Sequence, residues 1–393
     1  MKSKKLHLSS LMFFQLCVVG TYVPILSMYF KEYLGFSGLE VGVILSLASV
    51  PSILVPFLSA WVVDRIITSR KFLTYCHIGA AILITLLSFE TNYTLVLVTY
   101  FCYTILLVPT FALVNALIFH NMENSSGFGS IRGWGTIGWV VSSWLTGFLM
   151  NMSGGSQNMP LILQLSAFFS IIVIILTLKL PKIELDRNKK VSLLPREALR
   201  VIKKPQVILI YLLIFISATT DKFITFGLPL FLSDMGVQQS NVILYLSIGQ
   251  ISEMIMLFTL SATIKKLGFK KVFIFALILQ VLRYAIFYTD GPFPLTLFGI
   301  FLHGFIFTFF YAAATIYIDT FTDINSRGGV HQLLTLIQVG LAGLIGNFVA
   351  GFIAENFVIN GEINFKIFWL IPGSVSLLSL LTLAIFMAKK RNK

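Results

Sequence analysis

Long apolar runs limit how this chain can fold more than any other feature of its sequence. Runs of roughly 20 residues, enough to cross about 30 Å of hydrocarbon as a helix, recur about twelve times. The chain is 57% hydrophobic and 11% charged, which excludes an ordinary soluble domain. The runs lack the alternation typical of a barrel, so helices best satisfy the backbone in lipid. We expect an all-α membrane protein with spans near residues 9–30, 39–63, 72–89, 94–119, 132–150, 160–180, 206–232, 241–263, 271–289, 293–317, 329–353 and 366–388.

Basic residues gather in alternate loops between these spans. The opposite loops hold only Lys31 and Lys366. This is the positive-inside pattern, and it predicts that both termini are cytoplasmic. The net charge of +13 is therefore a signal of topology, and nucleic acid is not an expected partner. The basic positions are Lys2, Lys4, Lys5, Arg65, Arg70, Lys71, residues 179–204, Lys265, Lys266, Lys270, Lys271, Arg327 and the tail "AKKRNK".

The longest polar stretch divides the chain into two halves of six helices. We expect an N-terminal half at 1–180, a cytoplasmic linker at 181–205 and a C-terminal half at 206–393. A similar basic turn follows the second helix of each half, in "AWVVDRIITSRK" and "SATIKKLGFKK". Two six-helix halves with such a turn are typical of alternating-access transporters.

The first of these turns resembles the cytoplasmic turn of the major facilitator superfamily. Asp64, Arg65, Arg70 and Lys71 match that turn in residue type, although Ala60 replaces its leading glycine and the spacing is one residue looser. The resemblance implies the twelve-helix fold of that superfamily and a gating role for the turn. Basic residues gather in any short cytoplasmic loop, but that does not account for Asp64.

Ionisable residues within the spans are candidates for function, because lipid makes them costly. Gln250 and Glu253 are three residues apart and share one helix face, which indicates a water-lined path. A carboxyl there can take up and release a proton near physiological pH. We therefore expect Glu253 to couple transport to protons, although a structural ion pair is an alternative.

A second polar stripe lies on the fifth span, in "IRGWGTIGW". Arg132 and Thr136 are four residues apart, and Trp139 follows one turn later. A cation, a hydroxyl and an aromatic plate suit a polar ligand that contains a ring. Glycines between them permit close approach of a helix or a ligand. Alternatively, Arg132 lies at the cytoplasmic end and extends to the interface.

The remaining charged residues within the spans have several possible roles. Asp221 and Lys222 are adjacent and so point in different directions; we expect Asp221 to face the cavity. Arg283 favours a structural pairing, and His303 is a candidate proton relay. Asp319 and Asp323 favour a loop or a helix cap.

Taken together, these stretches resemble the nucleoside:proton symporters, a branch of the major facilitator superfamily found in bacterial inner membranes. The resemblance implies that Arg132, Thr136, Gln250 and Glu253 hold nucleoside, with Trp139 where the family has Phe. The stretches that carry it are "FFQLCVVGTYVP", "YCHIGAAILIT", "VPTFALVNALIF", "IRGWGTIGW", "GQISEMIML", "LRYAIFY" and "VHQLLTLIQVGLAGLIGNFVAG".

The chain departs from this family at two places. Asp221 and Ile224 stand where the family has Gln and Asn, and Phe307 and Thr308 stand where it has a Phe-Asp pair. Loss of that carboxylate removes a ribose-hydroxyl acceptor or a proton site, which Asp221 can replace from another helix.

The sequence thus predicts a proton-coupled importer of nucleosides in the bacterial cytoplasmic membrane. A symporter for another small polar solute and a proton-driven efflux antiporter are the alternatives. We expect no enzyme activity, cofactor or metal, because the five histidines are scattered and there is no phosphate-binding loop. The short loops favour a self-contained carrier that works as a monomer.

Overall fold

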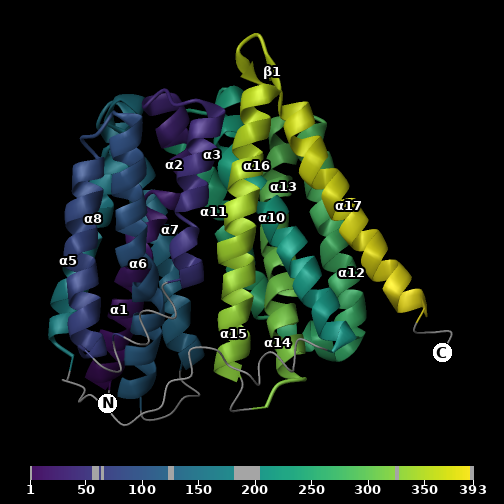
Figure 1. The fold of residues 1–393 in the computed structure, drawn as a ribbon, viewed down its shortest axis with the longest axis horizontal. Helices are drawn as coiled ribbons and strands as arrows, with labels where there is room; N and C mark the ends of the chain where they lie inside the picture. Colours follow the sequence, from purple (N-terminus) through teal and green to yellow (C-terminus); the bar gives the residue numbers. More distant parts are fainter. Residues whose placement is uncertain are drawn as a thin grey trace. The chain divides into compact units, whose positions relative to one another are not determined.

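Helices dominate the computed structural model, which describes residues 2–54, 62, 66–122, 128–180, 204–323 and 327–389 (Figure 1). Ten helices within these residues are long and apolar enough to cross a membrane. The second and fifth predicted spans correspond to a shorter apolar helix, Gly38–Leu54, and to α7 (Phe128–Met152). The prediction of an all-α membrane protein is confirmed.

Contacts between helices divide the chain into two compact units. Unit 1 comprises Met1–Phe36, Val50–Leu193 and Gly236–Leu244, and unit 2 comprises Ser37–Ser49, Leu194–Met235 and Tyr245–Lys393. The predicted division into two halves and a linker stays a prediction, and these units differ from it in two short segments and within the linker. Residues 37–49 belong with the second half, and residues 236–244 belong with the first.

Unit 1 is built around the first helix. α1 packs closely against α7 and α8, and α5 packs against α6 and α8. The elements are α1 (Lys2–Gly20), η1 (Val23–Ile25), α2 (Leu26–Met28), η2 (Tyr29–Tyr33), α5 (Ser69–Leu87), α6 (Tyr93–Asn121), α7, η4 (Gly155–Asn158) and α8 (Leu161–Leu178).

Unit 2 contains the remaining spans and one short hairpin. α10 packs against α16 and α17, α12 against α13 and α17, and α3 against α16. The elements are α3 (Gly38–Leu47), α10 (Pro205–Asp234), α11 (Gln239–Leu257, whose first residues belong to unit 1), α12 (Leu260–Tyr288), α13 (Phe293–Ile306), η5 (Phe307–Ala312), α14 (Ala313–Asp319), α15 (Arg327–Thr335), η7 (Leu336–Leu341), α16 (Ala342–Asn356), β1 (Val358–Ile359), β2 (Glu362–Ile363) and α17 (Phe365–Lys389).

Local signals explain where several helices begin. Ser37 and Glu40 form a capping box at the start of α3, and Thr68 and Asn92 cap α5 and α6. Pro205 begins α10, where its missing N–H costs nothing. These caps satisfy backbone groups that lipid would leave unpaired.

The hairpin between α16 and α17 was not predicted. β1 and β2 are antiparallel, with Val358 opposite Ile363. Asn360 and Gly361 both have positive φ, 53° and 86°, as a two-residue hairpin turn requires. The hairpin emerges from one end of unit 2, where α16 and α17 meet (Figure 1).

Three segments within the spans adopt π-helix geometry: η2, η5 and η7. Such segments shift the helix face by one residue and occur frequently at functional sites. η5 includes Phe307 and Thr308, two of the predicted site residues. A break of another kind lies at Gly268, whose φ of 74° interrupts α12 between two predicted spans.

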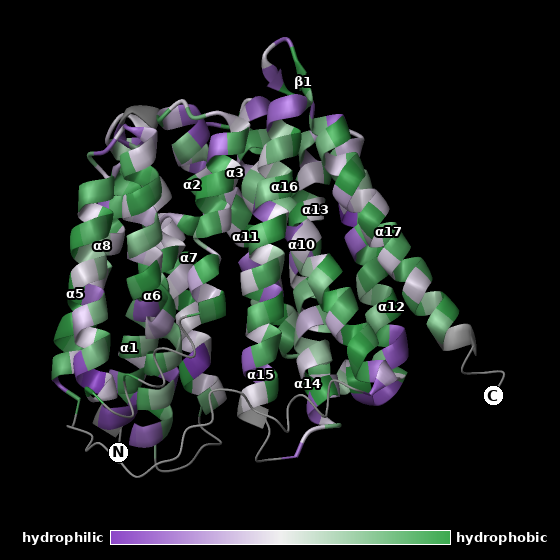
Figure 2. Ribbon diagram, in the orientation of Figure 1, coloured by the Kyte–Doolittle hydropathy of each residue, from purple (hydrophilic) through white to green (hydrophobic). Residues whose placement is uncertain are grey.

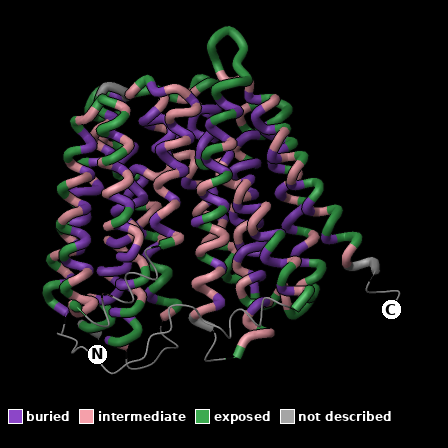
Figure 3. Tube along the Cα trace, in the orientation of Figure 1, coloured by how far each residue is buried: buried purple, intermediate pink, exposed green. Residues whose placement is uncertain are grey.

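Hydrophobic residues predominate along the long helices, while hydrophilic residues gather at several helix ends (Figure 2). On α17, Leu378 and Ile385 are 63% and 58% exposed, and much of this helix is exposed in Figure 3. Exposed aliphatic residues along a membrane-length helix match hydrocarbon and not water.

Candidate functional site

The polar stripe on α7 forms the part of the predicted site that belongs to unit 1. Arg132 is exposed and its guanidinium lies close to Gly135, where an added Cβ would come within 3.0 Å of Nη1. Thr136 is half-buried, and its hydroxyl has no hydrogen-bond partner among the described residues. The Nε1–H of Trp139 is buried and likewise has no partner there. Thr136 and Trp139 of the stripe thus each have a polar group without a described partner.

Two glycines of α7 have different surroundings. Gly138 faces α1, because a Cβ there would overlap the carbonyl of Phe13, and Cys17 Sγ donates to the Gly138 carbonyl at 3.3 Å. By contrast, an added Cβ at Gly133 would meet only open space. Gly138 thus permits the predicted close approach of a neighbouring helix.

In unit 2, Glu253 lies in the interior of α11 beside His303 of α13. Glu253 Oε2 and His303 Nε2 are 3.7 Å apart, and the two side chains are 17% and 25% exposed. Among the described residues, His303 is the partner that this carboxylate has. The amide of Gln250, one turn earlier on α11, has no described hydrogen-bond partner.

Close packing fixes the distance between α11 and α13. The Gly304 N–H donates to Ser252 Oγ at 3.0 Å, and this hydroxyl donates to the Phe301 carbonyl at 2.7 Å. A Cβ on Gly304 would overlap the backbone nitrogen of Glu253. A Cβ on Gly249 would come within 3.3 Å of His303. Glu253 and His303 are thus held side by side by backbones in near contact.

Asp221, the second carboxylate of this interior, is held much more tightly. Arg283 Nη2 donates to Asp221 Oδ1 at 2.5 Å, and the Tyr311 hydroxyl donates to Oδ2 at 3.2 Å. The Arg283 side chain is 1% exposed and that of Asp221 is 22% exposed. The interpretation of Arg283 as a structural partner agrees with this geometry.

Lys222, the neighbour of Asp221, takes a different direction, as expected for adjacent residues of a helix. Its side chain runs along α16, where a Cβ on Gly346 would come within 2.8 Å of Lys222 Cβ. Asp221 instead points to α12 and η5.

A hydrogen-bonded chain lies beside the ion pair. Ser217 Oγ donates to Gln280 Oε1, and Gln280 Nε2 donates to Thr220 Oγ1, both at 2.9 Å. This chain ties α10 to α12 at the level of Arg283. Two atoms of the guanidinium, Nε and Nη1, are buried without a partner among the described residues. Asp221 is therefore the main partner that balances the buried positive charge of Arg283.

The π-helix η5 connects these two acidic centres. The ring of Phe307 lies 6.3 Å from that of His303 and 6.0 Å from that of Tyr311. Thr308 is fully buried, and its hydroxyl has no partner among the described residues. His303, Phe307 and Tyr311 thus form one continuous face from Glu253 to Asp221.

The predicted cytoplasmic turn is only partly described. Asp64 and Arg65 lie outside the described residues. Arg70 Nη1 donates to the carbonyl of Leu180 at 2.6 Å and so connects α5 to the end of α8. Lys71 is exposed and contributes its backbone N–H to the Thr68 cap.

Sequence reasoning missed a buried polar cluster in unit 1. His77 is fully buried on α5, and its Nε2 lies 2.9 Å from Gln15 Oε1. Gln15 Nε2 in turn donates to Thr110 Oγ1 at 2.8 Å. The polar residues at mid-span in three helices were the signal that could have indicated this cluster.

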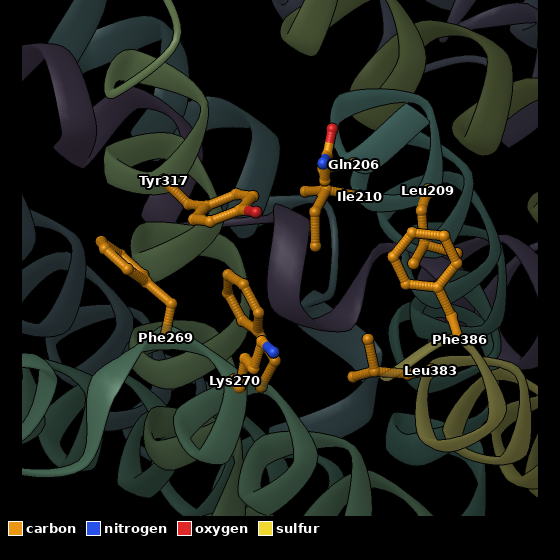
Figure 4. A pocket seen from close by; sticks show the side chains of 9 residues that line it. Gln206, Leu209, Ile210, Phe269, Lys270, Tyr317, Leu383 and Phe386 are labelled. Atoms are coloured by element: carbon orange, nitrogen blue, oxygen red, sulfur yellow. The ribbon is translucent and has the colours of Figure 1, made fainter. Parts of the chain in front are cut away.

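A small cavity at the end of unit 2 lies apart from the predicted site residues (Figure 4). Its volume is ≈ 40 Å³, and none of the predicted site residues lines it. It is lined by Gln206, Leu209, Ile210, Phe269, Lys270, Phe273, Tyr317, Leu383 and Phe386. The described residues contain no group of ligands suited to a metal ion.

Comparison with known proteins identifies the class of protein that carries this arrangement. A family described as "Nucleoside H+ symporter" matches residues 1–392. Nucleoside permease NupG of Escherichia coli (strain K12) is 24% identical over 399 residues, which cover 95% of this chain and 93% of the permease. The putative nucleoside transporter YegT of the same organism is 27% identical over 360 residues, or 88% and 84% of the two chains.

Solved structures agree with the predicted major facilitator fold. The crystal structure of nucleoside transporter NupG superposes with a TM-score of 0.87 at 21% identity, covering 98% of this chain and 99% of that one. A D-xylose-proton symporter superposes with a TM-score of 0.74 at 14% identity, covering 96% of each chain. These likenesses confirm the fold, and the match to the family confirms the predicted class, a transporter and not an enzyme. The chain belongs to the nucleoside H+ symporter family.

Proposed function

We propose that this protein imports nucleosides together with protons across the bacterial cytoplasmic membrane by alternating access, and that Glu253 carries the proton. The observation that supports this role is the setting of Glu253: a carboxylate inside a membrane-length helix, with a histidine at 3.7 Å as its described partner. A carboxylate without a permanent counter-ion can be neutral in one state and charged in another. Protonation then removes a charge that resists closure around the solute.

The α7 stripe supplies the chemistry that a nucleoside requires. A ribose and a base present hydroxyl groups, carbonyl groups, ring nitrogens and a flat face. Arg132 can donate hydrogen bonds from its guanidinium, Thr136 from its hydroxyl and Trp139 from its indole N–H. The indole ring also offers a stacking surface for the base. The absence of described partners for the Thr136 hydroxyl and the Trp139 N–H supports this assignment.

The contribution of unit 2 comes from α10, α11 and η5. We assign Gln250 to the base or ribose, since its amide both donates and accepts. Phe307 offers an aromatic edge, and the Thr308 hydroxyl is buried without a described partner. Asp221 still has unused lone pairs, so it can accept a ribose hydroxyl while bound to Arg283. The proton-coupling role is assigned to Glu253 and not to Asp221, because both oxygens of Asp221 already accept strong donors.

The remaining parts of the proposal concern topology and assembly. The distribution of basic residues supports cytoplasmic termini. Asp64, Arg65, Arg70 and Lys71 are proposed to gate the cytoplasmic side, with the Arg70 bond to Leu180 as their described contact. The protein is proposed to work as a monomer.

Uptake by reconstituted protein tests the function directly. Labelled uridine and adenosine are offered to proteoliposomes with and without an inward proton gradient, for the wild type and for Glu253→Gln. We expect gradient-driven accumulation in the wild type and its loss in Glu253→Gln, with exchange of nucleoside across the membrane retained. Glu362→Gln, an exposed carboxylate on β2, is the matched control and should behave as wild type.

Two outcomes contradict the proposal in different ways. If folded wild-type protein takes up neither nucleoside, the substrate assignment is wrong. If Glu253→Gln accumulates nucleoside as the wild type does, another group carries the proton.

A further inference from the structure

His303 is built into the surroundings of Glu253 by the contact between α11 and α13. The Ser252–Gly304 hydrogen bond of 3.0 Å lies next to Glu253 in the chain, and Gly304 follows His303 directly. Since the contact relies on glycine at this crossing, the 3.7 Å separation of the two side chains is a property of the packing. Both side chains keep some exposure, so water can reach the pair.

Within the described part of unit 2, ionisable groups on neighbouring elements lie near this pair. α10 contributes Asp221, α12 contributes Arg283, and η5 contributes the Tyr311 hydroxyl, whereas Lys222 points from α10 along α16. Asp221 and Arg283 already pair with each other. Among the described residues, His303 interacts electrostatically with both carboxylates, directly with Glu253 and at longer range with Asp221.

The chemistry of an imidazole next to a carboxylate differs from that of a carboxylate alone. The reference pKa of histidine is about 6.5 and that of glutamate about 4.3, so a free imidazole binds a proton at higher pH. Two titrating groups in contact bind protons as one unit, and the first proton belongs to the pair. The imidazole therefore helps to set the pH at which a pair of this kind takes up its first proton.

We propose that His303 and Glu253 together form the proton-binding site, with the imidazole as the group that first captures the proton. This inference rests on the proposed function and adds a second residue to it. A proton from outside binds His303 Nε2 and gives an imidazolium beside a carboxylate. An approach of about 1 Å brings Nε2 and Oε2 within hydrogen-bonding distance. Then the N–H bond breaks, an O–H bond forms at Glu253, and both side chains are neutral. The same proton leaves Oε2 on the cytoplasmic side.

The first test is the pH profile of uptake by His303→Gln, which keeps a hydrogen-bonding side chain but cannot ionise. We expect nucleoside exchange without a gradient to persist. The pH midpoint of gradient-driven uptake should move away from the wild-type value, because the proton then binds Glu253 without an imidazole beside it.

His331→Gln is the matched control, because His331 forms the other described imidazole–carboxylate contact of unit 2. Its Nε2 lies 3.0 Å from Asp319 Oδ1 at the junction of α14 and α15. This variant should keep the wild-type midpoint. An unchanged midpoint in His303→Gln, or an equal shift in both variants, overturns the proposal.

A second measurement does not depend on the substrate. The infrared absorption of protonated carboxyl groups is measured as a function of pH in reconstituted protein. The part of this absorption that is absent in Glu253→Gln is assigned to Glu253. In His303→Gln the titration of this band should change its midpoint, and an unchanged midpoint overturns the inference. If the wild type takes up no nucleoside but the pH midpoint of the carboxyl band differs in His303→Gln, nucleoside import is rejected. The inference that His303 and Glu253 bind the proton together is then still supported.

Discussion

The two carboxylates in the interior of unit 2 have opposite surroundings. Asp221 receives an arginine at 2.5 Å and a tyrosine hydroxyl at 3.2 Å. Glu253 has a histidine at 3.7 Å. The arginine cannot give up its charge, whereas the histidine can. This difference is the basis of the two proposed roles: a fixed charge at Asp221 and an exchangeable one at Glu253.

This difference explains why one span interior can contain several ionisable residues. A fixed pair shields its own charges, since the guanidinium and the carboxylate neutralise each other. The pair of Glu253 and His303, by contrast, can bind a proton without breaking a permanent ion pair. The two residue pairs lie on different helix pairs, α10 with α12 and α11 with α13.

The largest expected effect follows from breaking the fixed pair. Asp221→Asn leaves the buried Arg283 guanidinium without its charge partner, so we expect a loss of about 3 to 5 kcal/mol of stability. Thermal unfolding in detergent, followed by the loss of monodisperse protein, measures this loss. Asp319→Asn is the control: its partner His331 is more exposed, so the loss should stay below about 1 kcal/mol. A wild-type unfolding curve for Asp221→Asn would show that Arg283 does not depend on Asp221.

The double variant Asp221→Asn with Arg283→Gln extends this test. Removing both charges of a buried pair costs far less than removing one. We expect folded protein and gradient-driven accumulation to return, with a raised KM for nucleoside. A stable double variant that fails to accumulate nucleoside would instead make Asp221 a second proton site.

A smaller effect is expected at the crossing that positions the exchangeable pair. Gly304→Ala would push α13 away from α11, because the added carbon overlaps the backbone at Glu253. We expect a loss of about 1 to 3 kcal/mol in thermal unfolding and a shift of the pH midpoint of uptake in the same direction as for His303→Gln. Gly133→Ala has open space around the added carbon and should unfold at or slightly above the wild-type temperature. If both alanine variants unfold alike, the crossing is not tightly packed.

The fold could be predicted from the sequence, and candidate site residues could be proposed, because the relevant signals are local. The hydrophobic length of each span is local, as is the helical spacing that places Arg132 and Thr136 on one stripe. The family resemblance added the assignment to nucleosides. The roles of the site residues remain predictions.

The pairing of residues on different helices could not be predicted in this way. Asp221 and Arg283 are 62 residues apart, and only the packing of α10 on α12 brings them together. The π-helix geometry of η5 shifts the face that carries Tyr311 and leaves no clear mark in the sequence. His77 and Gln15 were missed for the same reason, since their hydrogen bond joins two helices.

The smallest expected effect isolates the hydroxyl that connects η5 to Asp221. Tyr311→Phe removes one hydrogen bond but keeps the ring against Phe307 and leaves the Arg283 pair intact. We expect a loss of about 0.5 to 1.5 kcal/mol in thermal unfolding, typical of one hydrogen bond. The pH midpoint of uptake should stay at the wild-type value, because Glu253 and His303 are untouched. A shift of that midpoint would mean that the two carboxylates act as one coupled system, and the distinction between a fixed and an exchangeable charge would fail.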